Sequence, residues 1–324
     1  MRFSIPLCIC AFAIAAQAAD TVLIFTRTNG GREDNIAPAR LGLKNYFESK
    51  GVLVDTSENA ALFTDTGLAK YKAVVFLKTS GDILNPAQQT AFEKYFQAGG
   101  GLMAIHSALD TEYNWPFYGI LIGGAYFMSL GGDLNTHQNI LVVDTNNPAT
   151  KNLPRVWPRT DEIYNFKANP RDSKSVNVHV LVTVDESTYK GGTPGKDHPM
   201  SWYDEYQGGR AWVTAMGHTT ASYSDTLFLG HLWGGLQYAM GRPVTALGYS
   251  APAPRAAPMD ARKSGKLVRM GPGASANPAA FGPIGSRFGD LKLFQPSGRA
   301  LSPAANAGKA NAGTAEGVEL FLIR

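Results

Sequence analysis

Short apolar runs alternate with amphipathic segments through the first half of the chain. Residues 36–50 repeat apolar side chains at helical spacing, and residues 86–98 begin with a proline and end before a glycine, so both segments predict helices. Four short runs before, between and after these helices are almost entirely apolar, which is typical of strands buried on both faces of a sheet. These runs are residues 21–25, 52–54, 73–77 and 102–105. Strands that alternate with helices predict βαβ units and a parallel sheet.

The second half of the chain is richer in strand-like segments and then changes in character. The predicted strands are residues 140–143, 178–182, 200–203 and 211–216. A helix over residues 226–239 is expected to close the folded region. From residue 243 onward nearly half of the residues are Ala, Gly or Pro, which is typical of a flexible, largely disordered extension. We therefore predict a three-layer α/β domain with a mostly parallel sheet over residues 19–242, and an extension over residues 243–324.

The first 18 residues have the features of a secretory signal peptide. A positive charge at Arg2 precedes an apolar run over residues 7–16, and residues 16–18 read Ala-Gln-Ala, which fits a cleavage site. We expect cleavage after Ala18 and a secreted product, extracellular or, in a bacterium, periplasmic. Both cysteines, Cys8 and Cys10, lie in this segment, so a cleaved chain has no thiol for a disulfide, a thiolate metal site or a nucleophile. No later run is long and apolar enough to span a membrane, so no membrane partner is expected.

The formal net charge of +4 is distributed unevenly along the chain. Residues 243–324 carry ten Lys or Arg and four Asp or Glu, which leaves 20 Lys or Arg and 22 Asp or Glu in residues 1–242, a net charge of −2. The positive charge belongs to the extension, and no nucleic-acid partner is expected.

Residues 99–108 contain the strongest indication of a functional site. They predict a helix end, a buried strand and a sharp turn in which His106 is flanked by small residues. In α/β enzymes this is the shape of a nucleophile elbow, which places one side chain above the carboxyl end of a central strand. The elbow normally carries Ser or Cys. A lone His at a strand end is more often packed against a backbone carbonyl, but the turn favours a functional role for His106.

Polar residues after the other predicted strands are further candidates, because ligands of parallel α/β sheets bind beyond the carboxyl ends of the strands. His218 follows residues 211–216 through a glycine. It could join His106 as an acid–base pair or as a second neutral metal ligand, or it could lie at the surface as an ordinary helix N-terminal residue. The other candidates at strand ends are Thr26, Arg27, Thr79, Gly81, Asp82 and Asp110.

Two more segments hold side chains that suit sugar hydroxyls. An extended backbone over residues 161–166 would place Glu162 and Tyr164 on one face, although an ordinary edge strand has the same pattern. His198 and Trp202 lie just before and within the strand predicted at residues 200–203. The indole could stack on a sugar, although a core Trp is the more frequent case.

These segments together resemble the ThuA-like (trehalose utilisation) family over residues 21–241, essentially the whole predicted folded region. The matching stretches are residues 25–28, 75–77, 99–108, 161–166, 197–202 and 217–219. The resemblance implies a flavodoxin-type fold similar to that of the class I glutamine amidotransferases, in which a Cys occupies the elbow and a catalytic His follows a late strand. His106 would replace that Cys and His218 would match that His, so amidotransferase chemistry would be lost. The family's link to carbohydrate metabolism implies trehalose or a keto-sugar derivative as the ligand.

One departure from the family concerns the segment after the first strand. Family members usually carry a His there, whereas this chain reads Gly31-Arg32-Glu33-Asp34. Either Glu33 replaces that His, or the activity is altered.

We therefore expect a secreted enzyme that acts on a sugar or an oxidised sugar by acid–base chemistry, as a hydrolase, lyase or isomerase. His106 and His218 would be the central catalytic pair, with Glu162 as a second acid or base. The same three residues are candidate ligands of a divalent metal ion, the cofactor that their chemistry suits. The expected sugar-binding residues are Thr26, Arg27, Thr79, Gly81, Asp82, Asp110, Tyr164, His198 and Trp202. The alternative is a non-catalytic carbohydrate-binding protein. A hydrolase of amides or esters is less favoured, because both the thiol and a G-x-S-x-G elbow are missing.

Overall fold

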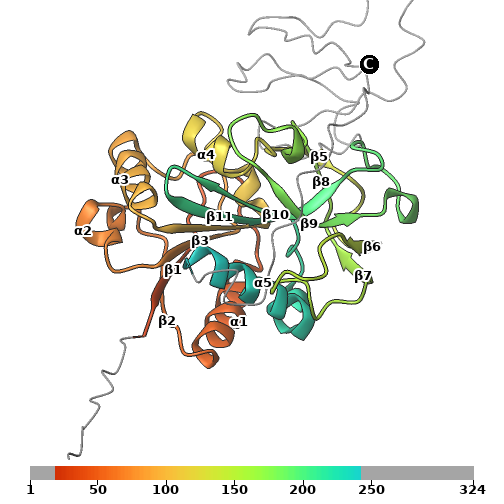
Figure 1. Cartoon of the computed structure of the whole chain (residues 1–324), viewed down its shortest axis with the longest axis horizontal. Helices are drawn as coiled ribbons and strands as arrows, with labels where there is room; N and C mark the ends of the chain where they lie inside the picture. Colours follow the sequence, from red (N-terminus) through yellow and green to blue (C-terminus); the bar gives the residue numbers. More distant parts are fainter. Residues whose placement is uncertain (1–18, 242–324) are drawn as a thin grey trace, which may run out of the picture.

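One mixed sheet of nine strands forms the centre of the computed structural model, which describes residues 19–241 (Figure 1). The predicted signal peptide, with Cys8 and Cys10, and the predicted extension lie outside the described residues. The sheet consists of β1 (Thr21–Phe25), β2 (Leu53–Ser57), β3 (Ala73–Leu77), β4 (Gly101–Ile105), β6 (Thr136–Val142), β7 (Val156–Asp161), β9 (His179–Val184), β10 (Pro199–Tyr206) and β11 (Gly209–Thr214). A separate antiparallel pair joins β5 (Phe127–Leu130) to β8 (Tyr164–Phe166).

Half of the large sheet is parallel and confirms the predicted α/β fold. Its strands lie in the order β2-β1-β3-β4-β11, which is the flavodoxin-like order for five successive strands. β1, β3 and β4 are buried along almost their whole length, as their continuous apolar runs predict. In sheets of this type the ligand site lies beyond the carboxyl ends of the strands, next to the point where the strand order reverses.

The other half of the sheet is antiparallel, in the order β11-β10-β9-β6-β7. β10 and β11 form a hairpin whose two loop residues, Gln207 and Gly208, have φ angles of 46° and 99°. Positive φ at both loop positions is the mark of a type I′ turn, whose twist matches that of the flanking strands. The strands expected at 140–143, 178–182 and 200–203 belong to this half, so the sheet is mixed rather than parallel throughout.

Helices cover both faces of the sheet and give the three predicted layers. α1 (Ile36–Ser49) and α5 (Thr226–Ala239) lie on one face, and α3 (Pro86–Gln97) and α4 (Pro116–Leu121) on the other (Figure 1). The helices predicted at 36–50, 86–98 and 226–239 are α1, α3 and α5 within one residue at each end. The short helices α2 (Asp65–Leu68) and α4 were not predicted. Among the described residues, no helix has the length and apolar character that a membrane crossing needs.

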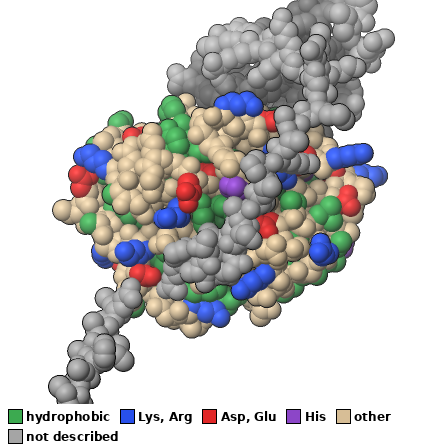
Figure 2. Space-filling view, viewed as in Figure 1, with side chains coloured by type: hydrophobic (Ala, Val, Ile, Leu, Met, Phe, Trp, Pro, Cys, Tyr) green, Lys and Arg blue, Asp and Glu red, His purple; other side chains and the backbone are tan. Residues whose placement is uncertain are grey.

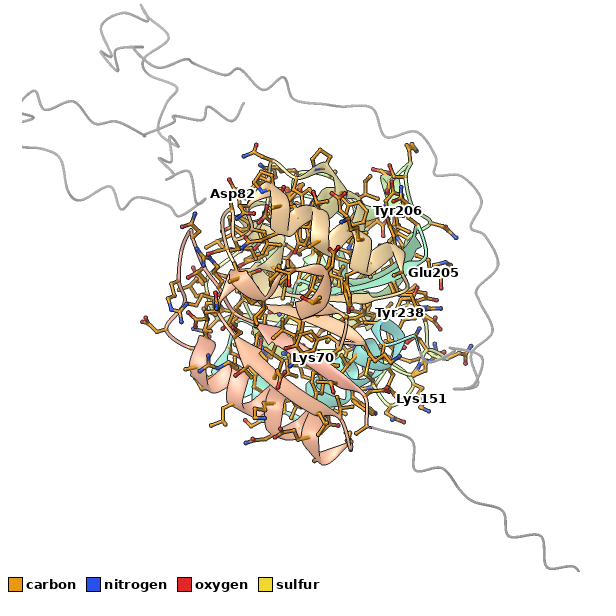
Figure 3. All side chains as sticks on the ribbon, turned by 90° about the vertical axis from the view of Figure 1, so that its left-hand side faces the viewer. Lys70, Asp82, Lys151, Glu205, Tyr206 and Tyr238 are labelled. Carbon is orange, nitrogen blue, oxygen red and sulfur yellow. The ribbon has the colours of Figure 1, made fainter. Side chains whose placement is uncertain are left out.

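Different residues lie at the two ends of the parallel strands. Asp82 follows β3 at the carboxyl end of the sheet, whereas Glu205 and Tyr206 lie at the hairpin before β11. Figure 3 shows Asp82 at one end of the molecule and Glu205, Tyr206 and Tyr238 at the other. On the face drawn in Figure 2, basic and acidic side chains are interspersed over the described surface.

Candidate functional site

The turn after β4 gives His106 an unusual backbone conformation. His106 has φ of 58°, in the left-handed region that residues with a Cβ seldom adopt. Lys78, which follows the neighbouring strand β3, has φ of 52°. The backbone therefore turns sharply after both β3 and β4, at the same edge of the sheet. The predicted elbow is present, with His106 at its apex. The His106 ring is fully buried and its Nδ1 lies 2.9 Å from the backbone oxygen of Ala215.

Four polar side chains surround the other ring nitrogen of His106. Its Nε2 lies 3.0 Å from Glu162 Oε2 and 3.2 Å from the Tyr164 hydroxyl. The same nitrogen is 3.3 Å from His218 Nδ1 and 3.6 Å from Glu33 Oε1. We call these five residues, Glu33, His106, Glu162, Tyr164 and His218, the histidine cluster. They come from four separate segments of the chain, so only the fold brings them together.

His218 reaches the cluster because a buried carboxylate holds its backbone. Asp161 Oδ1 accepts a hydrogen bond from the His218 backbone N–H at 2.8 Å, and Oδ2 accepts one from Gly217 at 2.9 Å. Asp161 is in turn paired with the buried Arg159 at 3.0 Å. The His218 ring then lies with Nδ1 3.1 Å from Glu33 Oε2 and 3.4 Å from Glu162 Oε2. Its side chain is 18% exposed, which connects the cluster to the surface.

Glu33, the residue at which the chain departs from the family, belongs to the cluster. Its carboxylate accepts hydrogen bonds from Ser107 Oγ at 2.9 Å and from Lys78 Nζ at 2.6 Å. Sequence reasoning raised Glu33 only as a replacement for a missing His, and the structure shows that its carboxylate contacts both imidazoles.

Lys78 is a buried ammonium that the sequence analysis did not single out. Its Nζ donates to Glu33 Oε2, to Asn35 Oδ1 and to the backbone oxygen of His218, each at 2.6 Å. Three acceptors satisfy all three of its protons, so Lys78 holds the segment after β1 against the segment after β11. The signal that could have revealed it is its position directly after a fully apolar strand.

Burial and ion pairing act in opposite directions on the pKa values of the cluster. Burial alone would lower the pKa of His106, but the carboxylates of Glu33 and Glu162 raise it above its ordinary value. Burial would raise the pKa of Glu33, but contacts with His106 and Lys78 hold it well below its ordinary value. Burial lowers the pKa of Lys78 despite the facing carboxylates. The cluster therefore stabilises charge on His106 and Glu33 together.

Asp110 lies next to this network on the turn that His106 begins. Burial raises the pKa of its carboxyl to about 6, although the Tyr113 hydroxyl donates a hydrogen bond to it at 2.6 Å. A carboxyl with this pKa can exchange a proton near neutral pH.

The segment predicted as one extended strand is divided between two sheets. Asp161 ends β7, while Tyr164 begins β8. Glu162 and Tyr164 nevertheless reach the same nitrogen of His106, as their predicted common face requires. Phe166 instead packs edge-on against His198 and Trp202.

His198 and Trp202 lie behind the cluster rather than within it. The buried His198 ring has Nε2 2.8 Å from the backbone oxygen of Tyr164 and Nδ1 2.9 Å from Glu186. It therefore supports the backbone of a cluster residue. Trp202 is fully buried in the hydrophobic core, where its indole N–H has no partner. The structure does not bring Trp202 to a surface where it could stack on a sugar, because the even-numbered side chains of this strand face the core under α4.

The candidates after β1 and β3 lie at the predicted edge of the sheet, but no hydrogen bond joins them to the histidine cluster within residues 19–241. Thr26 and Thr79 are fully buried, so the predicted contact of these two residues with a sugar is wrong; Thr26 bonds to Glu58, and Thr79 to Thr111. Arg27 is half-buried with an unpartnered Nε. Gly81, with φ of 70°, packs so closely on Gly30 that a Cβ would lie 2.7 Å from its nitrogen. Asp82 is exposed.

The arrangement has two chemical uses. Imidazoles, carboxylates and a phenol around one point can exchange protons with a bound molecule. The same imidazoles and carboxylates are ligands for a divalent metal ion, and Glu33, His106 and His218 each present a ligand atom within 4.8 Å of the others.

Comparisons with known proteins agree with the fold. The family model described as ThuA, trehalose utilisation, matches residues 21–239. A ThuA-like protein from Bacteroides uniformis is 21% identical, with a TM-score of 0.59 over 71% of this chain and 95% of that chain. One from Parabacteroides merdae is 21% identical, with a TM-score of 0.58 over 72% and 94%. No match is found among curated proteins.

Proposed function

The chain belongs to the ThuA (trehalose utilisation) family, and from this premise we propose that it is an enzyme that moves protons on a sugar or keto-sugar. Membership of the family supports a carbohydrate-related role. The observation that carries the proposal further is the convergence of Glu33, Glu162, Tyr164 and His218 on His106 Nε2, within 3.0 to 3.6 Å. The cleaved chain has no cysteine, so a thiol mechanism is not part of the proposal.

The reaction class that suits these groups is proton transfer at a carbon next to a carbonyl. A base must remove the proton while a donor stabilises the oxygen on which charge develops. Glu162 supplies a carboxylate base, and Tyr164 supplies a donor that stays protonated because burial raises its pKa. The carbon's proton passes to Glu162, the C–H electron pair forms an enediolate, and Tyr164 donates to its oxygen. His218 passes the proton of the neighbouring hydroxyl to the former carbonyl oxygen. Return of the first proton from Glu162 to the former carbonyl carbon then moves the carbonyl and yields an isomer.

The other candidate residues receive supporting roles in this proposal. Asp110 is a second acid near the carboxyl end of β4, and the Tyr164 backbone is held by His198. Arg27, Gly81 and Asp82 would contact the more distant parts of the sugar, because they follow β1 and β3 at the same sheet edge, whereas Thr26 and Thr79 are fully buried and do not reach it.

Exchange of solvent deuterium tests the proposal directly. The full chain without its first 18 residues is incubated with keto-disaccharides and their parent sugars in heavy water, and the sugars are analysed by NMR and mass spectrometry. We expect deuterium at the carbon next to the carbonyl. His106→Ala, His218→Ala and Glu162→Gln should each slow exchange by about 100-fold or more, the range for loss of a general acid or base.

A matched control is His179→Gln. His179 lies in β9, stacks on Tyr203 and has no contact with the histidine cluster. We expect this variant to exchange at the wild-type rate. Full activity in both His106→Ala and His218→Ala would overturn the proposal. Sugar binding without exchange would support the non-catalytic carbohydrate-binding alternative instead.

We also propose export of the protein, from the signal-peptide pattern of residues 1–18. Expression of the full chain in a Gram-negative host, followed by N-terminal sequencing of the periplasmic fraction, should give a chain that begins at Ala19. An uncleaved chain confined to the cytoplasm would contradict the proposal.

A further inference from the structure

We propose that Glu33, His106 and His218 form a binding site for one divalent first-row transition-metal ion, beside the carboxylate of Glu162. The inference rests on the proposed function for the choice of site, and it names the cofactor of that site. It does not require that the substrate be a sugar, so the two can be tested separately.

The distances between Glu33, His106 and His218 match those between ligands of one ion, and Glu162 lies beside both imidazoles. A tetrahedral site with bonds of about 2.0 Å has ligand atoms about 3.3 Å apart. His106 Nε2 and His218 Nδ1 are 3.3 Å apart, and Glu162 Oε2 lies 3.0 Å from the first and 3.4 Å from the second. The Glu33 carboxylate approaches the same nitrogens at 3.6 and 3.1 Å. A single ion can therefore contact both imidazoles and the Glu33 carboxylate, whose ligand atoms all lie within 4.8 Å of one another.

The orientation of His106 also favours a cation at this point. A carbonyl oxygen can only accept a hydrogen bond, so His106 Nδ1 donates to Ala215. When Nε2 carries no proton, its lone pair faces the lone pairs of Glu162. A proton on Nε2 serves one pair of atoms, whereas a metal ion in its place would bind both imidazoles and Glu33 at once.

The surroundings supply the supporting contacts that metal ligands usually have. Metal-binding His residues commonly donate their other N–H to a carbonyl or carboxylate, and ligating carboxylates accept further hydrogen bonds. His106 has its carbonyl partner, and Glu33 accepts from Ser107 Oγ and Lys78 Nζ. The backbone of His218 is held by Asp161. These contacts orient the ligands before an ion arrives.

Lys78 is the charge that opposes a cation here. Its ammonium lies 2.6 Å from Glu33 Oε2, but Asn35 Oδ1 and the His218 carbonyl share its charge. Two carboxylates, Glu33 and Glu162, face this single ammonium, so the cluster with neutral imidazoles has a net negative charge. Nitrogen and oxygen ligands of this kind suit zinc, manganese, iron and cobalt ions rather than calcium. Such an ion would act as a Lewis acid toward a carbonyl oxygen.

Metal binding is measured on the full chain without its signal peptide, after treatment with a chelator and dialysis. Calorimetry with Zn²⁺ and absorption spectroscopy with Co²⁺ should give one ion per chain, with the visible bands of four- or five-coordinate cobalt. Glu33→Gln, His106→Ala and His218→Ala should each weaken binding by more than the roughly 10- to 100-fold that follows loss of an outer partner. Ser107→Ala, which removes such a partner, should fall within that range, and His179→Gln should bind as wild type does. Thermal unfolding checks that each variant is folded.

The outcomes separate this inference from the proposed function. One bound Co²⁺ without any turnover of keto-sugars supports the metal site and contradicts the proposed function. Turnover that persists in chelator-treated protein, with no Zn²⁺, Co²⁺ or Mn²⁺ bound in wild type, supports the proposed function and overturns the metal site. Equal loss of affinity in His179→Gln and His218→Ala would also overturn it, because the ion would then be held by surface groups.

Discussion

The burial of Asp204 lowers the free energy of unfolding by an amount that depends on pH. Both carboxyl oxygens are buried without a hydrogen-bond partner, and burial raises the pKa of the carboxyl well above its ordinary value. The folded chain therefore keeps a proton on Asp204 at pH values where the unfolded chain has lost it. By linkage, the free energy of unfolding falls as pH rises from about 4, the ordinary Asp value, toward the folded pKa.

Asp204→Asn should remove this dependence, because the amide does not titrate. We expect the variant to gain stability over wild type as pH rises from 4 to 7, by at most about 1.4 kcal/mol per pH unit. Urea unfolding at each pH measures the difference, and Asp65→Asn, an exposed Asp in α2, is the control. Parallel stability profiles for Asp204→Asn and wild type would show that the folded carboxyl is ionised.

Asp161 connects the buried Arg159 to the backbone of His218, so its loss should be costly. Asp161→Asn removes one charge of a buried pair, which typically costs about 3–5 kcal/mol. Asp225 contacts the same guanidinium at 3.1 Å but is 36% exposed, and Asp225→Asn should cost about 1 kcal/mol or less. Urea unfolding at pH 7 compares the two variants. An equal decrease in the free energy of unfolding in both variants would mean that Asp161 stabilises Arg159 no more than Asp225 does.

At this scale the sequence predicted the residues that follow strands and missed those that support them. His106 and His218 could be found because strand ends of a parallel sheet converge, and Glu162 because an extended backbone over residues 161–166 places it on one face with Tyr164. Asp161 could not, because a buried charge is recognisable only when its partners are known, and Lys78 was missed although it directly follows a fully apolar strand. Trp202 was assigned to the sugar site on residue type alone, and its side chain instead lies on the face of β10 that packs in the core.

At the scale of elements, replacement of two glycines of α5 by alanine should change the stability of the protein in opposite directions. A Cβ on Gly234 would lie 2.4 Å from the backbone of Ala149, whereas one on Gly230 would meet nothing within 4 Å. Gly234→Ala should therefore destabilise the protein by about 1–3 kcal/mol through overpacking. Gly230→Ala should stabilise it by about 0.5–1 kcal/mol, because alanine favours the helix. Thermal unfolding of both variants measures the contrast, and a loss of similar size in each would contradict it.

The elements that sequence patterns missed have identifiable physical reasons. β7 alternates buried and exposed residues, but the buried positions hold Trp157, Arg159 and Asp161. Because two of these are charged, the hydrophobic alternation of a strand is hidden by an ion pair. The parallel strands β1, β3 and β4 were predicted correctly, since burial on both faces leaves no ambiguity in an apolar run.

At the scale of the whole molecule, residues 19–241 form all three layers, the sheet and the helices on each of its faces. Helices cover both faces of the sheet, and α5, the last described helix, packs on β4 and β11. A chain of residues 19–241 should therefore unfold within a few degrees of the chain of residues 19–324 when followed by circular dichroism. A decrease in Tm of more than about 5 °C, roughly 1–2 kcal/mol for a domain of this size, would show that residues 242–324 contribute to folding.

The left-handed backbone at His106 implies that activity and stability select different residues at this position. A side chain with a Cβ costs about 1–2 kcal/mol in this conformation relative to glycine, which adopts it freely. In a library of variants at position 106 screened only for folding, glycine and asparagine, which tolerate this backbone, should be enriched over the β-branched residues Val, Ile and Thr. In a library screened for turnover, histidine should persist in spite of the strain in its backbone.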